Sequence, residues 1–251
     1  MTEYYIFLNA PGACDDPIIF KNIFEKTTKF KTSEFTNNID KANVLLESVF
    51  NNKMYNIKNW KYKILWSGEP WINDTDNYDL ILFSKKTEKN IVDYPFYVYY
   101  LHTHHNTYNL LNRLIERPLI TKVPEKFCCF IVSNGDCKVR NNMFHYLNNY
   151  KKVESLGRYC NNMNFLLEYK WWTDEFRNYI SNYKFIICFE NSKICEDSNT
   201  YSTEKIVNPY IAGTIPIYWG SNNIHKVLSR NSMLFLEDES IESYQKIINE
   251  I

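Results

Sequence analysis

Short apolar runs alternate with amphipathic stretches along the chain, and this alternation restricts the possible fold more than any other feature. Runs typical of β-strands cover residues 4–8, 44–49, 63–66, 79–83, 126–132, 152–155, 183–189, 214–219 and 233–236. Helical periodicity is found over residues 17–30, 52–60, 137–149, 171–182, 222–228 and 239–251, and a further helix opens at 203. Strands that alternate with helices form parallel sheets, so the sequence predicts an α/β fold.

The chain is long enough for two domains, because 251 residues can form two cores of ordinary size. Two prolines bracket a break in the periodicity at residues 117–124, which is where a linker is expected. We therefore expect a Rossmann-like N-terminal domain over residues 1–120 and a second Rossmann-like domain over 121–238. A closing helix is expected over 239–251.

Charge and targeting features exclude several classes of protein. The 29 Lys and Arg residues balance 29 Asp and Glu residues, so no basic excess points to nucleic acid. The N-terminus lacks a signal pattern and no apolar run approaches the length of a membrane span, so a soluble, cytoplasmic protein is expected. The seven cysteines contain no C-x-x-C pair, which favours buried free thiols over disulfides.

Polar side chains follow several predicted strands at the point where each strand ends. In open parallel sheets these carboxyl ends form the ligand-binding edge, and two such edges facing each other would enclose a cleft. The residues that follow the strands are Ser67-Gly68-Glu69-Pro70, Ser133-Asn134 with the helix that bears Arg140, Glu190-Asn191-Ser192 and Gly220-Ser221-Asn222, and Lys205 lies on the first turn of the helix after Tyr201.

Two of these residues are cations at predicted helix starts. Lys205 and Arg140 would suit a phosphate or pyrophosphate there, because a helix N-terminus offers free N–H groups and a partial positive charge. The alternative is that Lys205 is solvated and Arg140 pairs with an acidic residue, and spacing alone favours this alternative. Glu69 lies between Gly68 and Pro70, on a turn suited to a general base, although an ordinary turn glutamate is the simpler interpretation.

Two further clusters have structural explanations. His102, His104 and His105 could bind a metal with two of them on one strand face, but no Cys or carboxylate cluster completes a site. Trp171 and Trp172 could stack on a sugar, although a tryptophan pair more often packs in a core. The sequence has no G-x-G-x-x-G, Walker or G-x-S-x-G motif, which argues against dinucleotide oxidoreductases, P-loop enzymes and serine hydrolases.

The run YKFIICFENSKICEDSNTYSTEKIVNPYIAGTIPIYWGS, at residues 183–221, resembles the donor-binding signature of the α-1,3-fucosyltransferases, glycosyltransferase family 10. Upstream, FCCFIVSNGDCKVRNNMFHYLNNYKKVESLGRYCNN is similar to the Ser-Asn, Arg, Tyr-x-x-Val and Gly-x-x-x-Asn pattern of that family. LWSGEPW, at 65–71, resembles its Gly-Glu-Pro element. The resemblance covers about residues 60–240 and is strongest over 126–221.

The resemblance implies a GT-B type enzyme whose second domain binds GDP-fucose and whose first domain presents a glycan acceptor. It implies an inverting transfer of L-fucose, to O3 of N-acetylglucosamine in the usual case, without a metal or a tightly bound cofactor. Glu69 matches the general base, and Arg140 and Lys205 match the pyrophosphate ligands. The remaining donor-site matches are Asn134, Glu190, Asn191, Tyr201 and, for the nucleotide sugar, Glu204.

Several points distinguish this chain from the family pattern. The loop over 192–200 is longer, Ser202 replaces a usual valine, and Pro209 is expected to kink its helix near Lys205. Animal members carry a membrane anchor, so the resemblance fits a soluble enzyme of a microbe or a large virus. A GT-B enzyme with another nucleotide sugar, or a non-catalytic glycan- or nucleotide-binding module, remain the alternative functions.

Overall fold

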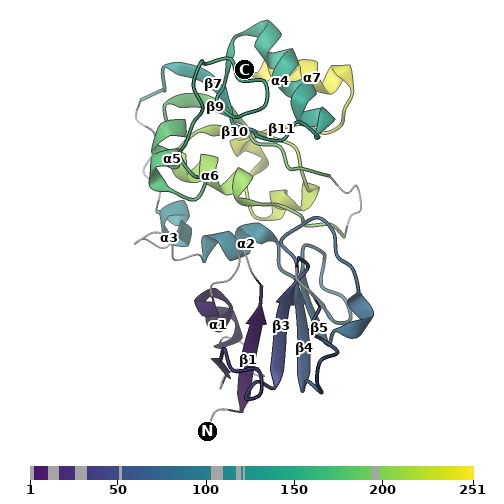
Figure 1. Cartoon of the computed structure of the whole chain (residues 1–251). Coiled ribbons are helices and arrows are strands. Elements are labelled where there is room, and N and C mark those ends of the chain that lie inside the picture. The colour runs from purple at the N-terminus through teal and green to yellow at the C-terminus, as the bar shows by residue number, and fades with distance from the viewer. Residues whose placement is uncertain are drawn as a thin grey trace. The chain divides into compact units, whose positions relative to one another are not determined.

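The computed structural model describes residues 3–10, 17–25, 33–50, 53–102, 110–116, 120, 122–193 and 198–251 (Figure 1). Contacts divide the chain into two compact units. The first unit contains Met1–His102 and Ser198–Tyr201, and the second contains Thr103–Asp197 and Ser202–Ile251. This division lies before the expected border at residue 120, because helix α3 (Leu110–Ile115) packs against α6 (Glu204–Ala212) of the second unit.

The first unit contains a six-stranded sheet in which every neighbouring pair is parallel, in the order β2-β1-β3-β4-β5-β6. Its elements are β1 (Tyr4–Asn9), α1 (Pro17–Glu25), β2 (Ser33–Phe35), β3 (Val44–Ser48), β4 (Tyr62–Trp66), the 3-10 helix η1 (Thr75–Asn77), β5 (Leu80–Phe83), β6 (Ile91–Asp93) and α2 (Phe96–Leu101). Aromatic and aliphatic side chains from α1 and α2 pack on one face of this sheet.

The second unit contains a five-stranded parallel sheet in the order β11-β10-β9-β7-β8. Besides α3 and α6, its elements are β7 (Lys126–Phe130), α4 (Lys138–Tyr150), β8 (Val153–Ser155), α5 (Asp174–Ile180), β9 (Tyr183–Ile187), β10 (Ile215–Tyr218), η2 (Asn222–Lys226), η3 (Arg230–Ser232), β11 (Leu234–Phe235) and α7 (Ile241–Glu250). Counted along its own unit, its five strands follow the same order as the first five strands of the first sheet.

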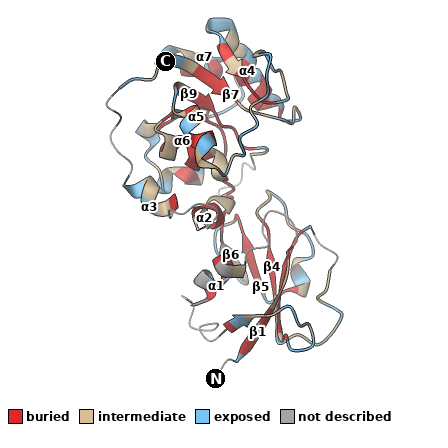
Figure 2. Cartoon of the chain, turned by 60° about the vertical axis from the view of Figure 1, so that its left-hand side comes forward, coloured by how far each residue is buried: buried red, intermediate tan, exposed pale blue. Residues whose placement is uncertain are grey.

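The central strands of the second sheet are buried on both faces (Figure 2). Cys128 and Phe130 of β7 pack with side chains of α4 and α7, which lie side by side in Figure 1. Cys129, between them, points to the opposite face and packs with Phe176 and Ile180 of α5. Alternation along a strand that is apolar throughout is the arrangement expected of a parallel sheet covered by helices on both sides.

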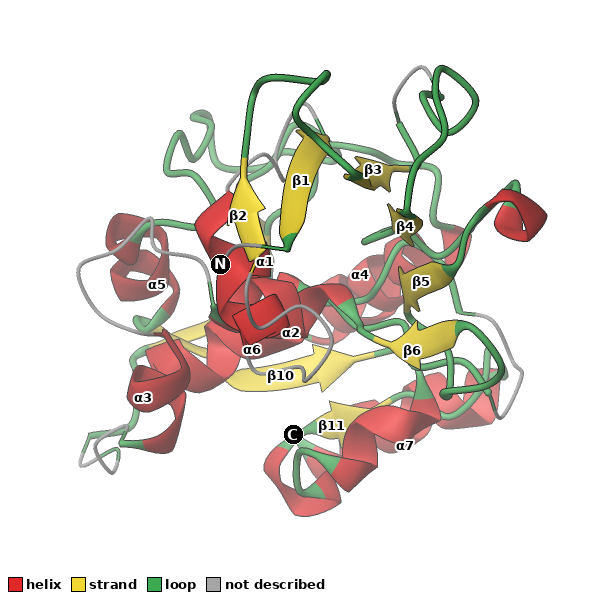
Figure 3. Cartoon of the chain, turned by 90° about the horizontal axis from the view of Figure 1, so that it is seen from below, coloured by secondary structure: helices red, strands yellow, loops and turns green. Residues whose placement is uncertain are grey.

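The α/β alternation is confirmed, but several predicted elements differ (Figure 3). The predicted helix over 52–60 is wrong, since residues 53–60 form turns in which Lys58 Nζ donates to the carbonyl oxygens of Ile39 and Ala42, at 2.8 and 2.6 Å. Residues 222–226 form a 3-10 helix rather than an α-helix. His102 follows α2 in a helical conformation, and His104, the residue expected on the same strand face, lies outside the described residues.

The described cysteines agree with the expectation of buried free thiols. Five cysteines are free thiols, of which four are buried: Cys128, Cys129, Cys137 and Cys188 are buried, and Cys160 is half-buried. Cys14 and Cys195 lie outside the described residues. Within the described ranges, no helix has both the length and the apolar character needed to cross a membrane.

Candidate functional site

The second sheet reverses its strand order between β7 and β9. The chain leaves β7 toward β8 on one side, whereas β9 pairs with β7 on the other side, so the loops after β7 and β9 separate here. Ligands of open parallel sheets bind beyond the carboxyl ends of the strands at such a point. We call the residues that follow β7, β9 and β10, together with the first turn of α6, the second-unit edge.

Arg140, near the start of α4, joins the loops that follow β7 and β9. Its Nη1 donates to Oδ1 of Asn191 at 3.0 Å, and its Nη2 donates to the carbonyl oxygen of Asn134 at 2.8 Å. The side chain is buried, its Nε has no hydrogen-bond partner among the described residues, and burial lowers the pKa of the guanidinium. A buried cation whose hydrogen-bond acceptors are both neutral is suited to an anionic ligand, because uncompensated buried charge is costly.

Glu190 lies beyond β9 and is fully buried, with an exposed fraction of 0%. Its Oε1 accepts from the amide of Thr203 at 2.8 Å and from the hydroxyl of Tyr218 at 3.1 Å, and its Oε2 accepts from the hydroxyl of Thr203 at 2.8 Å. Burial raises the pKa of this carboxyl, and nearby Lys205 opposes the shift. With no exposed surface, Glu190 acts on its surroundings through Thr203, Tyr218 and Lys205.

Lys205 lies on the first turn of α6, and its side chain is 25% exposed. Its Nζ lies 3.6 Å from Oε2 of Glu190, 3.6 Å from Oε1 of Glu204 and 3.2 Å from the hydroxyl oxygen of Thr203. Burial by itself would lower the pKa of Lys205, but Glu204 and Glu190 raise it above its ordinary value. The ammonium is therefore charged at neutral pH and adds to the positive end of the α6 dipole.

Two residues of this cluster were not predicted as site residues. Thr203 was predicted only as a helix start, yet its hydroxyl accepts from the amide of Lys205 as the N-cap and also donates to Glu190. Tyr218 lies in an apolar strand, where nothing in the sequence pattern distinguishes its hydroxyl from a core side chain. Gly220 is the one signal, because a Cβ there would lie 2.3 Å from the Tyr218 hydroxyl oxygen and 2.9 Å from Cγ of Glu190.

Glu69 lies in the first unit, on the turn that follows β4, and is half-buried. Its amide donates to the hydroxyl oxygen of Ser67 at 3.2 Å, and that hydroxyl donates to the carbonyl oxygen of Trp71 at 2.8 Å. Gly68 leaves no room for a side chain, since a Cβ would lie 2.6 Å from Cδ2 of Phe96. The turn therefore holds the Glu69 backbone in a fixed position, as the sequence predicts.

The predicted residues thus fall into two groups. The second unit brings together six of them at its edge: Asn134, Arg140, Glu190, Asn191, Glu204 and Lys205. Glu69 and Tyr201 belong to the first unit. Tyr201 is 3% exposed, and its amide donates to Oδ1 of Asn199 at 2.8 Å.

The two other clusters noted in the sequence, the histidines and the tryptophan pair, give less support to a ligand site. His104 and His105 lie outside the described residues, and the described part of the chain contains no group of three or more His, Cys, Asp or Glu placed to hold a metal ion. Trp171 and Trp172 meet edge to face, with ring centroids 5.0 Å apart. Trp171 packs against the core as expected, whereas Trp172 is 37% exposed.

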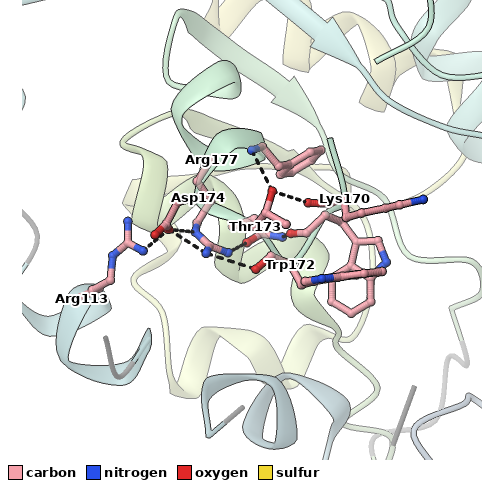
Figure 4. A network of polar contacts seen from close by, with 9 residues as sticks. Arg113, Lys170, Trp172, Thr173, Asp174 and Arg177 are labelled. Atoms are coloured by element: carbon pink, nitrogen blue, oxygen red, sulfur yellow. Dashed lines mark hydrogen bonds and ion pairs between the residues drawn. The ribbon is translucent and has the colours of Figure 1, made fainter. Parts of the chain in front are cut away.

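A partly buried polar network includes the carbonyl of Trp172 (Figure 4). Arg177 is fully buried, and its Nη2 donates to Asp174 at 2.8 Å and to the carbonyl oxygen of Trp172 at 3.3 Å (Figure 4). Arg113 of α3 forms an ion pair with the same Asp174. The network ties α3 to α5, which explains why the segment after residue 102 belongs to the second unit.

Comparisons with known proteins identify the family of the chain. A family model described as "Glycosyltransferase family 10 (fucosyltransferase) C-term" matches residues 121–251. A putative fucosyltransferase of Acanthamoeba polyphaga mimivirus is 30% identical over 185 residues, which are 70% of this chain and 29% of that protein. The α-(1,3)-fucosyltransferase FucT of Helicobacter pylori is 33% identical over 112 residues, which are 45% of this chain and 21% of that protein.

Human GDP-fucose protein O-fucosyltransferase 3 is 30% identical over 125 residues, or 47% of this chain and 25% of that protein. This chain therefore spans less than a third of the length of these relatives. A crystal structure of an α1,3-fucosyltransferase with GDP-fucose has a TM-score of 0.69 at 21% identity, covering 98% of this chain and 77% of that chain. That likeness confirms the expected GT-B type α/β fold with parallel sheets. Because the family model matches more than half of its length, the chain belongs to glycosyltransferase family 10, the fucosyltransferases.

Proposed function

We propose that the protein transfers L-fucose from GDP-fucose to a hydroxyl of a glycan, O3 of N-acetylglucosamine in the first instance, with inversion at the fucose anomeric carbon. The observation that carries the proposal is the pair of cations at the second-unit edge: Arg140 with neutral partners, and Lys205 with a raised pKa at a helix N-terminus. Family membership supports the reaction class, and the similar solved structure contains GDP-fucose.

The proposed donor site is built on these cations. Arg140, Lys205 and the free N–H groups at the start of α6 bind the pyrophosphate and stabilise the charge that develops on departing GDP. In this way they fill the role that a divalent ion has in many nucleotide-sugar enzymes, and we propose a metal-independent reaction. Glu204 accepts from ribose hydroxyls, and Asn134 and Asn191 line the donor pocket. Tyr201, which belongs to the first unit, is assigned to donor binding by its motif alone.

Glu190 takes a different part in this proposal from the one that its motif suggests. A carboxylate with no exposed surface holds Thr203 and Lys205 in place and does not contact the nucleotide. We therefore classify Glu190 and Thr203 as positioning residues. The hydroxyl of Tyr218 also donates a hydrogen bond to the Glu190 carboxylate.

Glu69 acts as the general base. Its carboxylate takes the proton from the acceptor hydroxyl, whose oxygen forms a bond to C1 of fucose as the bond between C1 and the β-phosphate oxygen breaks. The electron pair leaves with GDP, at the phosphate held by Arg140 and Lys205. The fixed turn after β4 supports this role, because a general base must be held within hydrogen-bond reach of its proton.

Donor identity is tested by calorimetry with GDP-fucose, GDP-mannose and UDP-sugars. We expect GDP-fucose to bind most tightly, and tighter binding of another nucleotide sugar would replace the fucose donor in the proposal. Transfer is tested on a glycan array with labelled GDP-fucose, where product on Gal-GlcNAc glycans is expected. Binding of GDP-fucose without transfer to any acceptor would instead indicate a non-catalytic binding module.

A protein hydroxyl is a second candidate acceptor. Several relatives, including those of human and zebrafish, are named GDP-fucose protein O-fucosyltransferase 3. Mass spectrometry of proteins incubated with enzyme and GDP-fucose distinguishes the two candidates, since only protein transfer adds a deoxyhexose to Ser or Thr. The cytoplasmic location of the enzyme stays a prediction.

A further inference from the structure

The first unit presents an exposed aromatic pair at the carboxyl ends of its strands. Phe50 is 62% exposed and Trp71 is 41% exposed, and their rings meet edge to face with centroids 5.7 Å apart. Phe50 follows β3 and Trp71 follows β4. These neighbouring strands end in register, with Ser48 opposite Trp66, so the two following loops leave the sheet side by side.

This pair lies beside Glu69. Trp71 is two residues from Glu69, so their Cα atoms lie within about 7 Å of each other. The Ser67 hydroxyl donates to the carbonyl oxygen of Trp71 at 2.8 Å and accepts from the amide of Glu69 at 3.2 Å, which fixes both residues on one turn. An occupant of the aromatic pair would therefore lie beside the turn that carries Glu69.

We propose that Phe50 and Trp71 form the acceptor platform, on which the C–H face of the acceptor's pyranose ring packs while its hydroxyl faces Glu69. This inference rests on the proposed function, because it takes Glu69 to be the base that deprotonates the acceptor. The platform explains how the first unit can hold a neutral sugar without a charged contact. Aromatic rings provide a large apolar surface at little conformational cost, since their side chains have only two rotatable bonds.

The size of the platform favours a sugar over a protein surface. A stable protein interface buries about 800 Å² on each partner. A single aromatic side chain buries only about 150–250 Å², so two partly exposed rings match one or two sugar rings. The exposed residue Ile57, at 50%, does not extend this patch, since it belongs to the turns beside Lys58 at the opposite ends of the strands.

Trp171 and Trp172 provide an internal contrast. Both aromatic pairs have an interplanar angle of 88°. In the second unit, however, Trp171 packs against the core, and the two tryptophan carbonyls accept from buried Asn208 and Arg177. Trp172 is therefore a matched control, because it is an exposed tryptophan in an edge-to-face pair whose surroundings are explained by packing.

The test measures the acceptor and the donor separately for Trp71→Ala, Phe50→Ala and the milder Trp71→Phe, with Trp172→Ala and Ile57→Ala as controls. With N-acetyllactosamine as the acceptor, we expect Trp71→Ala to raise the acceptor KM by about tenfold and Phe50→Ala by a smaller factor. Trp71→Phe should recover much of the loss. The GDP-fucose Kd, measured by calorimetry, should be unchanged in every variant, which also shows that the variants are folded.

An acceptor KM that is unchanged in Trp71→Ala and Phe50→Ala, in an enzyme that transfers fucose, would overturn the platform and leave the proposed function intact. The opposite case is a chain that binds the glycan but not GDP-fucose. It is tested by measuring the binding of N-acetyllactosamine by nuclear magnetic resonance in the absence of a donor. If the wild-type chain binds no GDP-fucose but binds this glycan through Trp71, the proposed function fails and the platform stands. If transfer occurs only to protein hydroxyls and no glycan binds, the glycan platform is rejected.

Discussion

Two fully buried glutamates occupy corresponding places in the two units, and their surroundings differ. Glu47 lies at the end of β3 and Glu190 lies beyond β9, each strand being the third in its unit. Each carboxylate accepts from a tyrosine hydroxyl, that of Tyr78 or of Tyr218. Glu47 is otherwise satisfied by the side chain of Asn9 and the amide of Met54, at 2.9 and 3.0 Å, whereas Glu190 faces Lys205.

Two sheets that share the order of their first five strands can thus give a buried glutamate near the end of the third strand different partners. Among the described residues, the Glu47 carboxylate accepts hydrogen bonds from neutral groups, and the bond from Met54 ties the segment after β3 to the sheet. The charge of Glu190 is shared with a lysine that is partly exposed at the edge, so it influences whatever binds there. The loops after β3 and β4, which we call the first edge, thus carry the Phe50–Trp71 pair and the half-buried Glu69, whereas the second-unit edge carries the cations Arg140 and Lys205 beside Glu190 and Glu204. This difference fits a neutral acceptor and an anionic donor.

The largest effect that would sharpen this comparison is expected for Glu69→Gln. A general base contributes about 10²- to 10⁴-fold, and glutamine keeps the shape of the side chain but cannot take the proton. Transfer should fall by that factor, while the GDP-fucose Kd from calorimetry stays unchanged. Full transfer activity in this variant would remove Glu69 as the base and leave the first edge with a binding role only.

The next largest effect is expected for Lys205→Ala. Losing one charge-assisted contact costs about 1.5–3 kcal/mol, so the GDP-fucose Kd should rise by roughly 10- to 150-fold. Lys205→Arg should recover part of the affinity because the charge is retained. Acceptor binding should be unaffected, since it belongs to the first edge. An unchanged donor Kd would contradict the division of labour between the two edges.

Glu190→Gln and Glu47→Gln form a matched pair. Glu190 helps to raise the pKa of Lys205, so Glu190→Gln should lower that pKa and move the loss of GDP-fucose affinity at alkaline pH to lower pH. Glu47→Gln should leave this pH profile unchanged. The measurement is the GDP-fucose Kd from pH 6 to 11. Identical profiles for the two variants would show that Glu190 has only a structural role.

The same variants should differ in stability. Burial raises the pKa of Glu190 in the folded state. The contribution of this group to folding stability therefore falls as the pH rises above the pKa that Glu190 has in the unfolded chain. Removing the charge in Glu190→Gln should therefore leave Tm at pH 7 equal or higher, with a smaller difference at pH 4, where Glu190 is protonated. Tm is measured by calorimetry, and a large decrease at pH 7 would contradict a destabilising charge.

The smallest effect is expected for Asp238→Asn, an exposed position beyond β11. Hydrogen bonds from Ser240 and Ser243 lower the pKa of Asp238 to about 2. A carboxyl whose pKa is lowered by folding stabilises the folded state at any pH above the pKa that it has in the unfolded chain. This stabilisation is lost as the pH falls toward 2. The variant should therefore lower Tm slightly at pH 7 and not at pH 2, with donor affinity unchanged. A change in GDP-fucose affinity would show that the donor site extends to the segment after β11.

The sequence predicted long strands and local charges better than short elements. Central strands such as β7 and β9 are apolar on both faces, which a run of residues reveals directly. β2 and β6 have three residues each and no visible period. The helix α2 is an unbroken apolar run after Pro95, which also fits a strand. The segment 52–60 has helical spacing, but the tertiary hydrogen bonds of Lys58 determine its path.

The candidate site shows the same limit. Arg140, Glu190 and Lys205 could be selected from the sequence because charged residues at strand and helix ends are visible there, and their motif resembles a family. Tyr218 and the Phe50–Trp71 pair could not, because their roles depend on which loops the sheet brings together. The position of the unit division also depends on tertiary contacts, since α3 is held by α6 and by Asp174.

The segment Ser198–Tyr201 has a consequence for exchanging parts between related enzymes. It belongs to the first unit although it lies late in the chain, and it is held there by hydrogen bonds between Ser198 and Lys86 and between Thr200 and Ser84, at 2.7 and 3.2 Å. A chimera made with a single crossover near residue 102 would therefore combine one parent's first unit with another parent's short insert. Exchanging the whole first unit therefore requires a second exchange at 198–201, a segment that ends four residues before Lys205 at the start of α6.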